Sequence, residues 1–365
     1  MWNKFYGLSV ACASVALAIS VGASTSQAAE AFYKGKTITV LVGLSAGGGT
    51  DRGARAFTRF MGKHIPGNPG IIVKNMTGAG GQKALNFLYE KSRRDGLTLF
   101  FGAWNAPGAL IGLPGVRSDP AKLEMVGSGG GTYLSIIRTN VAPGIKASKD
   151  IAKTNGFIMG GIRPTVVLDM LSRMSFDIMG VKYRYVPGYR GQAKLNPAIQ
   201  SNEIQAVTTG YQGYRLFYKD TLLKNGKAIV AWHHPPYDGK GNQMVSGSIA
   251  GAKSFLDVYQ EIHGKKPSGT LWDAYRWTTT IIGASTQSLI APPGTPKQAL
   301  ADLRKAHVAT RNDPDFKAAW AKQFGIQLSW LKPGEDQRIL KTYKNVKPEI
   351  VGLLKKYLKK VKRKR

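Results

Sequence analysis

Ser45 lies in the pattern G-x-S-x-G, which Gly43-Leu44-Ser45-Ala46-Gly47 forms. This pattern is typical of the nucleophile elbow of serine hydrolases. It follows the apolar run "ITVLV" and precedes "DRGARAFTRFMGKH", which predicts a helix. A glycine turn between a strand and a helix N-terminus also suits anion binding by backbone N–H groups. The local sequence therefore leaves catalysis and anion binding as alternatives.

The rest of the sequence gives the hydrolase interpretation little support. A nucleophile elbow follows several strands of a hydrolase sheet, whereas Ser45 follows the first strand of the mature chain. Catalysis also needs an acid and a histidine in a defined order. His233, His234, His263 and His307 stand in no recognisable context of this kind. A secreted serine hydrolase remains the alternative to a binding protein.

Nucleotide and metal sites lack the residues they need. A P-loop needs a lysine after its glycines, and none stands at that place after 47–49. Gly78 and Gly80 are followed by Lys83 where a dinucleotide fingerprint has its third glycine. His233 and His234 are adjacent, so on a strand they point to opposite faces, and no cysteine completes a metal set. We expect no cofactor and no metal.

Two stretches, "KYRYVPGYRG" and "YQGYRLFYKD", interleave aromatic and basic residues. Such interleaving is typical of proteins that bind single-stranded nucleic acid. In an exported protein we interpret these stretches as the rim of a cleft for a small anion instead. We expect no nucleic-acid partner.

The N-terminus indicates export. Lys4 precedes the apolar stretch "LSVACASVALAISVGA", and Ser26-Gln27-Ala28 offers a cleavage site. We expect residues 1–28 to be a signal peptide cleaved near Ala28, and the product to be periplasmic; a retained anchor is the alternative. The only cysteine, Cys12, leaves with this signal, so the mature chain can form no internal disulfide.

The full sequence is strongly basic. Its net charge of +31 favours anionic partners and raises their capture rate. Eight of the last eleven residues, "KKYLKKVKRKR", are Lys or Arg, and this tail is predicted to extend a helix. The mature chain is long enough for two domains.

Strand-like and helical stretches alternate along the mature chain, which favours an α/β fold with mainly parallel sheets. We predict lobe 1 from residues 29–137 and 286–365, and lobe 2 from residues 138–285. Residues 233–268 show no regular pattern. The predicted strands are "TITVLVG", "GIIVKN", "LTLFFGAW", "YLSIIRTN", "FIMGG", "VKYRYVPG", "IQAVTTG" and "KAIVAWHH".

Polar and glycine-rich loops follow predicted strands in both halves. Backbone N–H groups at such loops can approach a carboxylate closely. Arg163 and Arg190 are expected to add charge-assisted contacts, and Asp51 is interpreted as structural because it lies near a helix N-terminus. The loops are 45–50, 78–81, 103–105, 160–165, 188–192 and 208–211.

Four blocks of the sequence resemble the substrate-binding proteins of tripartite tricarboxylate transporters. They extend from about residue 32 to residue 325, most of the mature chain. The blocks are "TITVLVGLSAGGGTDRGAR", "GIIVKNMTGAGGQKALNFLYEKSRRDGLTLFFG", "YRYVPGYRG" and "LIAPPGTPKQALADLRKA" with "DPDFKAAWAKQFG".

This resemblance implies a two-lobed periplasmic-binding-protein fold, type II-like, that closes on a small organic carboxylate. In the family, backbone amides of one loop from each lobe hold the carboxylate, and by position these loops are 45–48 and 189–191. The "GAGG" turn maps to 78–81. The full set of expected ligand-binding residues is Ser45, Ala46, Gly47, Gly48, Thr50, Gly78, Ala79, Gly80, Trp104, Asn105, Arg163, Thr165, Tyr189, Arg190, Gly191 and Thr209.

The resemblance also implies a membrane permease as partner and a chain that acts as a monomer without enzymatic activity. The ligand class is a mono- to tricarboxylate, and a sensing subunit without transport is an alternative. This chain departs from the family at Gly43-Leu44, where Pro-Phe is common, at the inserted Gly188, and at "TTGYQGYR". These departures leave the identity of the ligand open.

Overall fold

Eleven strands of the described residues form two sheets. The computed structural model describes residues 31–237, 242–243, 248–283, 286–325 and 329–359, so the predicted signal peptide lies outside them. Residues Phe32–Arg365 form one unit, separate from Met1–Ala31. The first sheet contains β1 (Thr37–Val42), β2 (Gly70–Asn75), β3 (Thr98–Gly102), β4 (Glu124–Gly130), β10 (Gln287–Ala291) and β11 (Ser329–Trp330). The second contains β5 (Tyr133–Arg138), β6 (Phe157–Gly161), β7 (Tyr183–Pro187), β8 (Ala206–Gly210) and β9 (Ala228–His234).

Both sheets are mixed, which corrects the expectation of mainly parallel pairing. In the first sheet, β1 pairs in parallel with β2 and β3, whereas β10 is antiparallel to β3 and β4. In the second, β6 is parallel to β7 and β8, whereas β5 is antiparallel to β8 and β9. β5 follows β4 almost directly. It therefore begins at the end of the second sheet where β6, β7 and β8 finish, and it runs antiparallel to β8.

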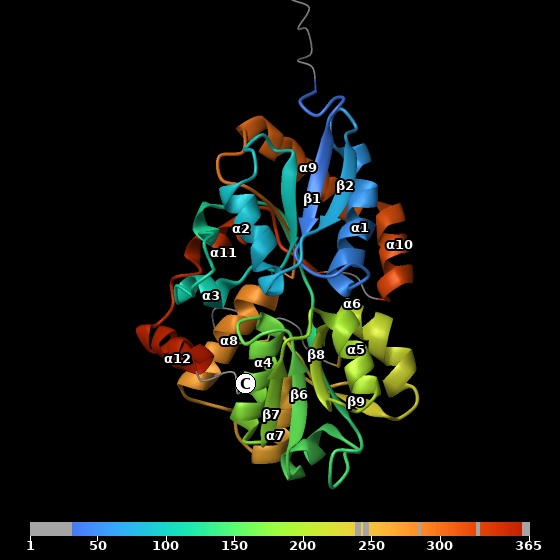
Figure 1. Cartoon of the computed structure of the whole chain (residues 1–365), viewed down its shortest axis with the longest axis vertical. Helices are drawn as coiled ribbons and strands as arrows, with labels where there is room; N and C mark the ends of the chain where they lie inside the picture. The colour runs from blue at the N-terminus through green and yellow to red at the C-terminus, as the bar shows by residue number, and fades with distance from the viewer. Residues whose placement is uncertain (1–30, 238–241, 244–247, 284–285, 326–328, 360–365) are drawn as a thin grey trace, which may run out of the picture. The chain divides into compact units, whose positions relative to one another are not determined.

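Alternation along the strands explains why both faces of a sheet are covered. Ile38, Val40 and Val42 pack into one hydrophobic cluster, and Leu41 packs into another. Neighbouring side chains of a strand point to opposite faces, so an apolar run such as "ITVLV" needs helices on both sides. Figure 1 shows α1 beside β1 and β2, and α4 and α5 beside the second sheet.

Helices connect most of the strands. A π-helix, Tyr214–Leu223, continues α6, and four short 3₁₀ turns lie at 62–64, 79–81, 120–122 and 148–153. The α-helices are α1 (Gly49–Met61), α2 (Gln82–Glu90), α3 (Ala106–Leu110), α4 (Val167–Met179), α5 (Gln192–Gln200), α6 (Tyr211–Gly213), α7 (Phe255–His263), α8 (Thr270–Gly283), α9 (Lys297–Asn312), α10 (Pro314–Phe324), α11 (Glu335–Thr342) and α12 (Pro348–Lys359).

The chain first passes between the sheets a few residues before the expected lobe boundary. β5 belongs to the second sheet from Tyr133 onward, five residues before the expected boundary at residue 138. The last described helix, α12, packs against α8, and its Tyr357 hydroxyl donates to Asp177 of α4 at 2.7 Å. Arg173 of α4 lies 4.6 Å from the centre of the Tyr357 ring. The C-terminal part of the chain thus contacts helices on both sheets.

Residues 233–268 are more regular than their sequence indicates. They include α7, which begins where the Ser254 hydroxyl accepts the Asp257 N–H at 3.1 Å. Residues 238–241 and 244–247 of this segment lie outside the described residues.

Candidate ligand-binding site

One cavity lies where loops of the two sheets meet, and its volume is about 120 Å³. One wall comes from the loops after β1, β2 and β3, and the other from the loops after β6, β7 and β8. Residues 131–133 and 286–287, next to the crossings between the sheets, complete the lining. Ligands of α/β proteins bind outside the carboxyl ends of the strands, and this cavity lies there.

This cavity is lined by residues at the starts of α1, α2, α4 and α5 and of the short helices α3 and α6. The first N–H groups of a helix have no partner within the helix and carry partial positive charge. No side chain caps α1, α2, α4 or α5 in the described structure, whereas Ser254 caps α7. The first N–H groups of α2 are bonded to the Ala79 and Gly78 carbonyls, so the donors offered to an anion come from the starts of α1, α4 and α5. The residues at the four helix starts that line it are Gly49, Gly81, Val167 and Gln192.

Among the described residues, the lining contains no Asp, Glu, Lys, Arg or His. Its apolar side chains include Phe100, Phe101, Ile162 and Leu168. An anion in this cavity would be held by neutral dipoles rather than by ion pairs. The polar lining side chains are Ser45, Thr50, Asn105, Thr132, Tyr133, Thr165, Gln192, Thr209, Gln212, Thr286 and Gln287.

Asp51 shapes the loop after β1 from behind the cavity. Its carboxylate accepts the Gly47 N–H at 2.9 Å, the Asn75 amide at 2.9 Å and Arg55 at 3.1 Å. Burial alone would raise the pKa of Asp51, but these hydrogen bonds bring the pKa below its usual value. Asn75 also donates to the Leu44 carbonyl at 2.9 Å. These contacts agree with the structural interpretation of Asp51.

Glycines let the two sets of loops touch. Gly80 has φ +64°, and a Cβ there would lie 2.4 Å from the Val166 methyl of the second sheet's loop. A Cβ at Gly49 would lie 3.2 Å from the Gly213 nitrogen. The Ser45 hydroxyl donates to the Arg190 carbonyl at 2.9 Å. The closed cavity depends on these approaches.

Gln192 fixes the start of α5. Its side-chain amide donates to the Thr208 carbonyl at 2.7 Å, and its carbonyl accepts the Tyr218 hydroxyl at 2.7 Å. Both ends of the side chain are therefore engaged within the second sheet's helices and strands. The backbone N–H groups at the start of α5 are left to face the cavity.

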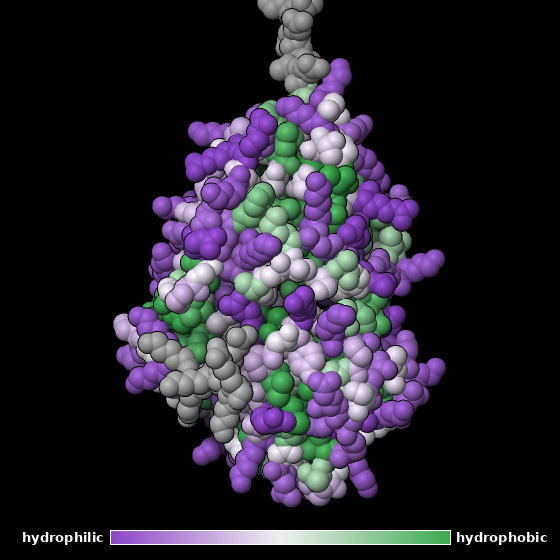
Figure 2. Space-filling view, in the orientation of Figure 1, coloured by the Kyte–Doolittle hydropathy of each residue, from purple (hydrophilic) through white to green (hydrophobic). Residues whose placement is uncertain are grey.

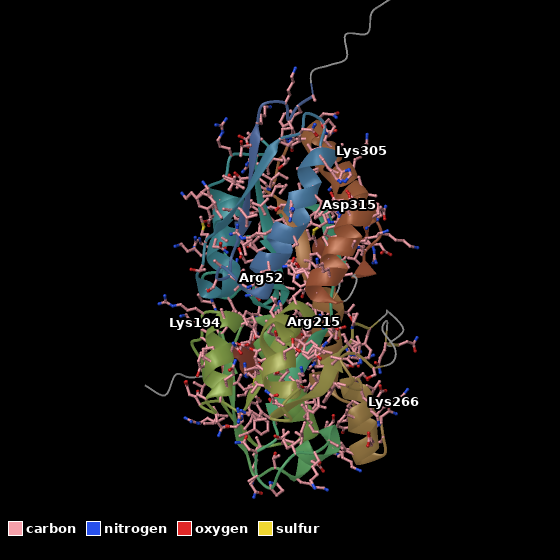
Figure 3. All side chains as sticks on the ribbon, turned by 90° about the vertical axis from the view of Figure 1, so that its right-hand side faces the viewer. Arg52, Lys194, Arg215, Lys266, Lys305 and Asp315 are labelled. Carbon is pink, nitrogen blue, oxygen red and sulfur yellow. The ribbon has the colours of Figure 1, made fainter. Side chains whose placement is uncertain are left out.

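Positive charge surrounds the loops without entering the cavity. Figure 3 shows Arg52 on α1, Lys194 on α5 and Arg215 on the π-helix near the place where the loops meet. Hydrophilic residues also predominate on the face shown in Figure 2. The field of these cations attracts anions toward the cavity.

The structure brings nine of the sixteen expected residues together in the cavity lining. Asn105 also caps α3, because its side chain accepts the Gly108 N–H at 2.9 Å. Trp104 is 1% exposed, and its ring packs edge-on against Tyr343. The nine residues are Ser45, Gly48, Thr50, Gly80, Trp104, Asn105, Thr165, Gly191 and Thr209.

The other seven do not line the cavity, and both expected arginines are among them. The Arg190 side chain is exposed, and Arg163 lies beside Gly80. The Tyr189 hydroxyl donates to Glu203 instead. A guanidinium facing this uncharged cavity would lose part of its hydration without gaining a carboxylate partner from the protein. The remaining four are Ala46, Gly47, Gly78 and Ala79.

Sequence reasoning missed residues that line the cavity next to the crossings between the sheets. Thr132 and Tyr133 lie between β4 and the body of β5, and Gln287 begins β10. The run "GGGT" before Tyr133 is a usable signal for a crossing loop. No strand was predicted before this run, because the residues of β4 were not recognised as a strand.

The geometry gives Ser45 no histidine partner among the described residues. His234 contacts the Ser135 hydroxyl at 2.8 Å and the Tyr275 hydroxyl at 2.9 Å, and burial lowers its pKa to about 3. His64 pairs with Asp313 at 2.8 Å. No group of three metal-binding side chains was found in the described part of the chain. Its helices are also too short or too polar to cross a bilayer.

Comparison with solved structures identifies the fold. No protein-family profile and no curated protein sequence matches this chain. Among solved structures, the periplasmic binding protein BugD matches with a TM-score of 0.64 and 17% identity, over 89% of this chain and 98% of its own. MatC from Rhodopseudomonas palustris, solved with malate, matches with a TM-score of 0.59 and 20% identity, over 89% and 97%. An R. palustris protein solved with adipate matches with a TM-score of 0.63 and 14% identity, over 89% and 98%. The chain therefore has the two-lobed α/β fold of periplasmic binding proteins.

Proposed function

We propose that this chain is an exported solute-binding protein that captures a small organic carboxylate between its two sheets. The observation that carries the proposal is an uncharged cavity that is lined by the starts of α1, α4 and α5, none of which has a side-chain cap. A carboxylate satisfies such N–H groups and is favoured by the helix dipoles. A neutral solute would lack the negative charge that the helix dipoles favour, and a cation would face the positive ends of the dipoles.

The ligand class is a mono- to tricarboxylate. Two solved structures with the same fold carry malate and adipate, and the sequence blocks resemble tricarboxylate-transporter receptors. The nine cavity-lining residues that the sequence predicts are proposed to contact the ligand, together with Tyr133, Gln192 and Gln287. The apolar side chains Phe100, Phe101 and Leu168 would enclose its carbon chain.

Binding is proposed to close the two lobes about the crossings between the sheets. The expected lobes, 29–137 with 286–365 and 138–285, are retained, with the first crossing moved to Gly131-Thr132 because β5 belongs to the second sheet. A ligand that touches loops of both lobes stabilises the closed arrangement relative to an open one.

The cellular role follows from the resemblance. The chain is proposed to act in the periplasm as a monomer, after cleavage near Ala28, and to deliver its ligand to a membrane permease. A sensing role uses the same binding step without transport. Uptake of the radiolabelled ligand by proteoliposomes that contain a permease encoded beside this gene would separate the two roles.

The binding step is tested by screening organic acids by thermal shift and then measuring their binding by calorimetry. At least one mono- to tricarboxylate is expected to raise the melting temperature, by an increment equivalent to about 2.7 kcal/mol at a hundred times its Kd. The primary amide of the same acid is the matched control and is expected to give no shift. If no acid stabilises the protein, or if acid and amide act equally, the proposal is wrong.

A further inference from the structure

A second, larger cavity lies on the first sheet and shares no lining residue with the first. It is a groove between α9 and α11 with a volume of about 850 Å³. Both helices pack on β4, and Val126 and Gly127 of that strand form its floor. All its lining residues belong to β4, α9, α11 or the adjoining residues 331–334. We call this feature the α9–α11 groove.

Cations line both banks of this groove. Lys305 on α9 and Arg338 and Lys341 on α11 are exposed. None of these three forms an ion pair with a carboxylate within the described part of the chain. Figure 3 shows Lys305 on α9. Three unneutralised cations on two facing helices make a strongly positive rim.

Two further arginines hold the walls together. Arg304 donates to the Met125 carbonyl at 2.9 Å and lies 3.4 Å from Glu124. Arg311 donates to the Leu331 carbonyl at 2.7 Å. The one acidic lining residue, Asp336, is 7% exposed, and burial raises its pKa. The groove is thus built by contacts within the protein, and its accessible charge is positive.

The surface between the banks is largely apolar. It is formed by the side chains of Val126, Val308, Ala309, Leu331 and Pro333. A small inorganic anion would use only the cations, and a neutral apolar molecule would use only the floor. An amphipathic helix with an apolar stripe flanked by Asp and Glu uses both.

We propose that the α9–α11 groove is a docking surface for an acidic amphipathic helix of a partner protein. The apolar stripe of that helix lies on Val308 and Leu331, and its carboxylates face Lys305, Arg338 and Lys341. The groove shares no residue with the carboxylate cavity, so this proposal stands or falls independently of the proposed function.

A synthetic peptide of about 14 residues, with Leu at helical i, i+3, i+4 and i+7 spacing and Glu elsewhere, tests the proposal. Fluorescence anisotropy of the labelled peptide is expected to give a Kd in the micromolar range. The same peptide with Lys in place of Glu is expected not to bind. Absence of binding by the Glu peptide at about 200 μM, or equal binding of both peptides, would overturn the proposal.

Charge reversal then locates the binding surface. The double variant Lys305→Glu with Lys341→Glu is expected to raise the Kd of the Glu peptide about tenfold or more. The matched control is Lys265→Glu with Lys266→Glu, two exposed lysines after α7 that lie outside the groove. It changes net charge by the same amount and is expected to weaken binding less than about twofold. Equal weakening by both double variants would show a general effect of net charge and would overturn the proposal.

An apolar-floor variant and a lipid control complete the test. Val308→Ser keeps the cations and is expected to raise the Kd of the Glu peptide about threefold or more, because it removes part of the apolar surface of the groove. Melting curves check that each variant is folded. Phosphatidylglycerol vesicles that bind through the same lysines, without any binding of the Glu peptide, would show that the groove serves a membrane surface and would contradict the proposal.

Discussion

The Ser45 hydroxyl donates a hydrogen bond to the Arg190 carbonyl at 2.9 Å, and so joins the loop after β1 to the loop after β7. This contact crosses between the two sheets beside the cavity that Ser45 lines. Ser45 therefore joins the two loops, a role that does not require it to act as a nucleophile. It also turns the Arg190 backbone toward the first sheet while the Arg190 side chain stays exposed.

Ser45→Ala is expected to weaken carboxylate binding about three- to tenfold, since one hydrogen bond between the lobes contributes about 1 kcal/mol. The melting temperature of the ligand-free protein should change little, because Ser45 is only half-buried. Calorimetry measures the affinity, and Ser201→Ala, at the far end of α5, is the control. Ester hydrolysis by the parent that Ser45→Ala abolishes would instead support the hydrolase alternative.

Gly80→Ala is expected to weaken binding tenfold or more. The new Cβ would lie 2.4 Å from Val166, so the loops could not approach fully, and the positive φ adds about 1–2 kcal/mol of strain. Gly35→Ala is a matched control, because Gly35 has φ +67° with no atom within 4 Å of a Cβ. It should carry the same strain and leave affinity unchanged. Adding Val166→Ala to Gly80→Ala should restore part of the affinity; no restoration would argue against the steric explanation.

Thr50→Glu and Thr50→Gln differ mainly in charge at the start of α1. The Glu variant is expected to bind the carboxylate at least about a hundredfold more weakly than the Gln variant, since two like charges repel strongly in a dry cavity. Its melting temperature should not fall, because an acidic residue in the first turn of a helix is favourable. Equal affinities of the two variants would show that the ligand carboxylate does not lie near α1.

Stability is expected to depend on pH through Asp169 in the first turn of α4. Its carboxylate accepts the Tyr185 hydroxyl and the Arg163 N–H, each at 2.7 Å. Burial raises its pKa from 3.8 to about 7, despite these hydrogen bonds. The folded protein therefore holds a proton that the unfolded chain has lost, and the stability from this proton disappears as pH rises from about 4 to 7.

Asp169→Asn removes that dependence. Relative to the parent, the variant is expected to gain roughly 4 kcal/mol in free energy of unfolding between about pH 4 and pH 7.5, as measured by urea unfolding. Asp150 is a control of opposite sign. Hydrogen bonds from the Ala147 and Lys146 N–H groups lower its pKa, so the deficit of Asp150→Asn should shrink on acidification. A pH-independent difference for Asp169→Asn would contradict the prediction.

Salt is expected to act on the rate of association and not on dissociation. The net charge of +31 attracts an anion from a distance, whereas the cavity lining itself is uncharged. Raising ionic strength from about 20 to 500 mM should slow association about tenfold and change dissociation less than about twofold. Stopped-flow tryptophan fluorescence measures both rates. A large change in dissociation would indicate an ion pair with the bound ligand.

Local sequence patterns predicted the strands of the βαβ units well. β2 and β6 have the bounds of "GIIVKN" and "FIMGG", because short apolar runs between turn residues indicate buried strands. β4 was missed, since "EMVGSGG" lacks the usual strand composition. Gly127 in this strand is required by a contact from elsewhere in the fold, because a Cβ there would lie 2.2 Å from the His307 ring. No pattern within the strand itself reveals a ring supplied by α9.

By itself, the sequence determined the α/β rhythm, the strand-turn-helix loops and the positive charge, since each follows from neighbouring residues or from composition. Only the tertiary structure decided which loops meet, that the uncapped starts of α1, α4 and α5 share one cavity, and that Arg163 and Arg190 stay out of it. The reason is that a strand end and a helix N-terminus are local features. Which groups face one another depends on contacts between residues far apart in the chain, such as Ser45 with Arg190 and Gly80 with Val166.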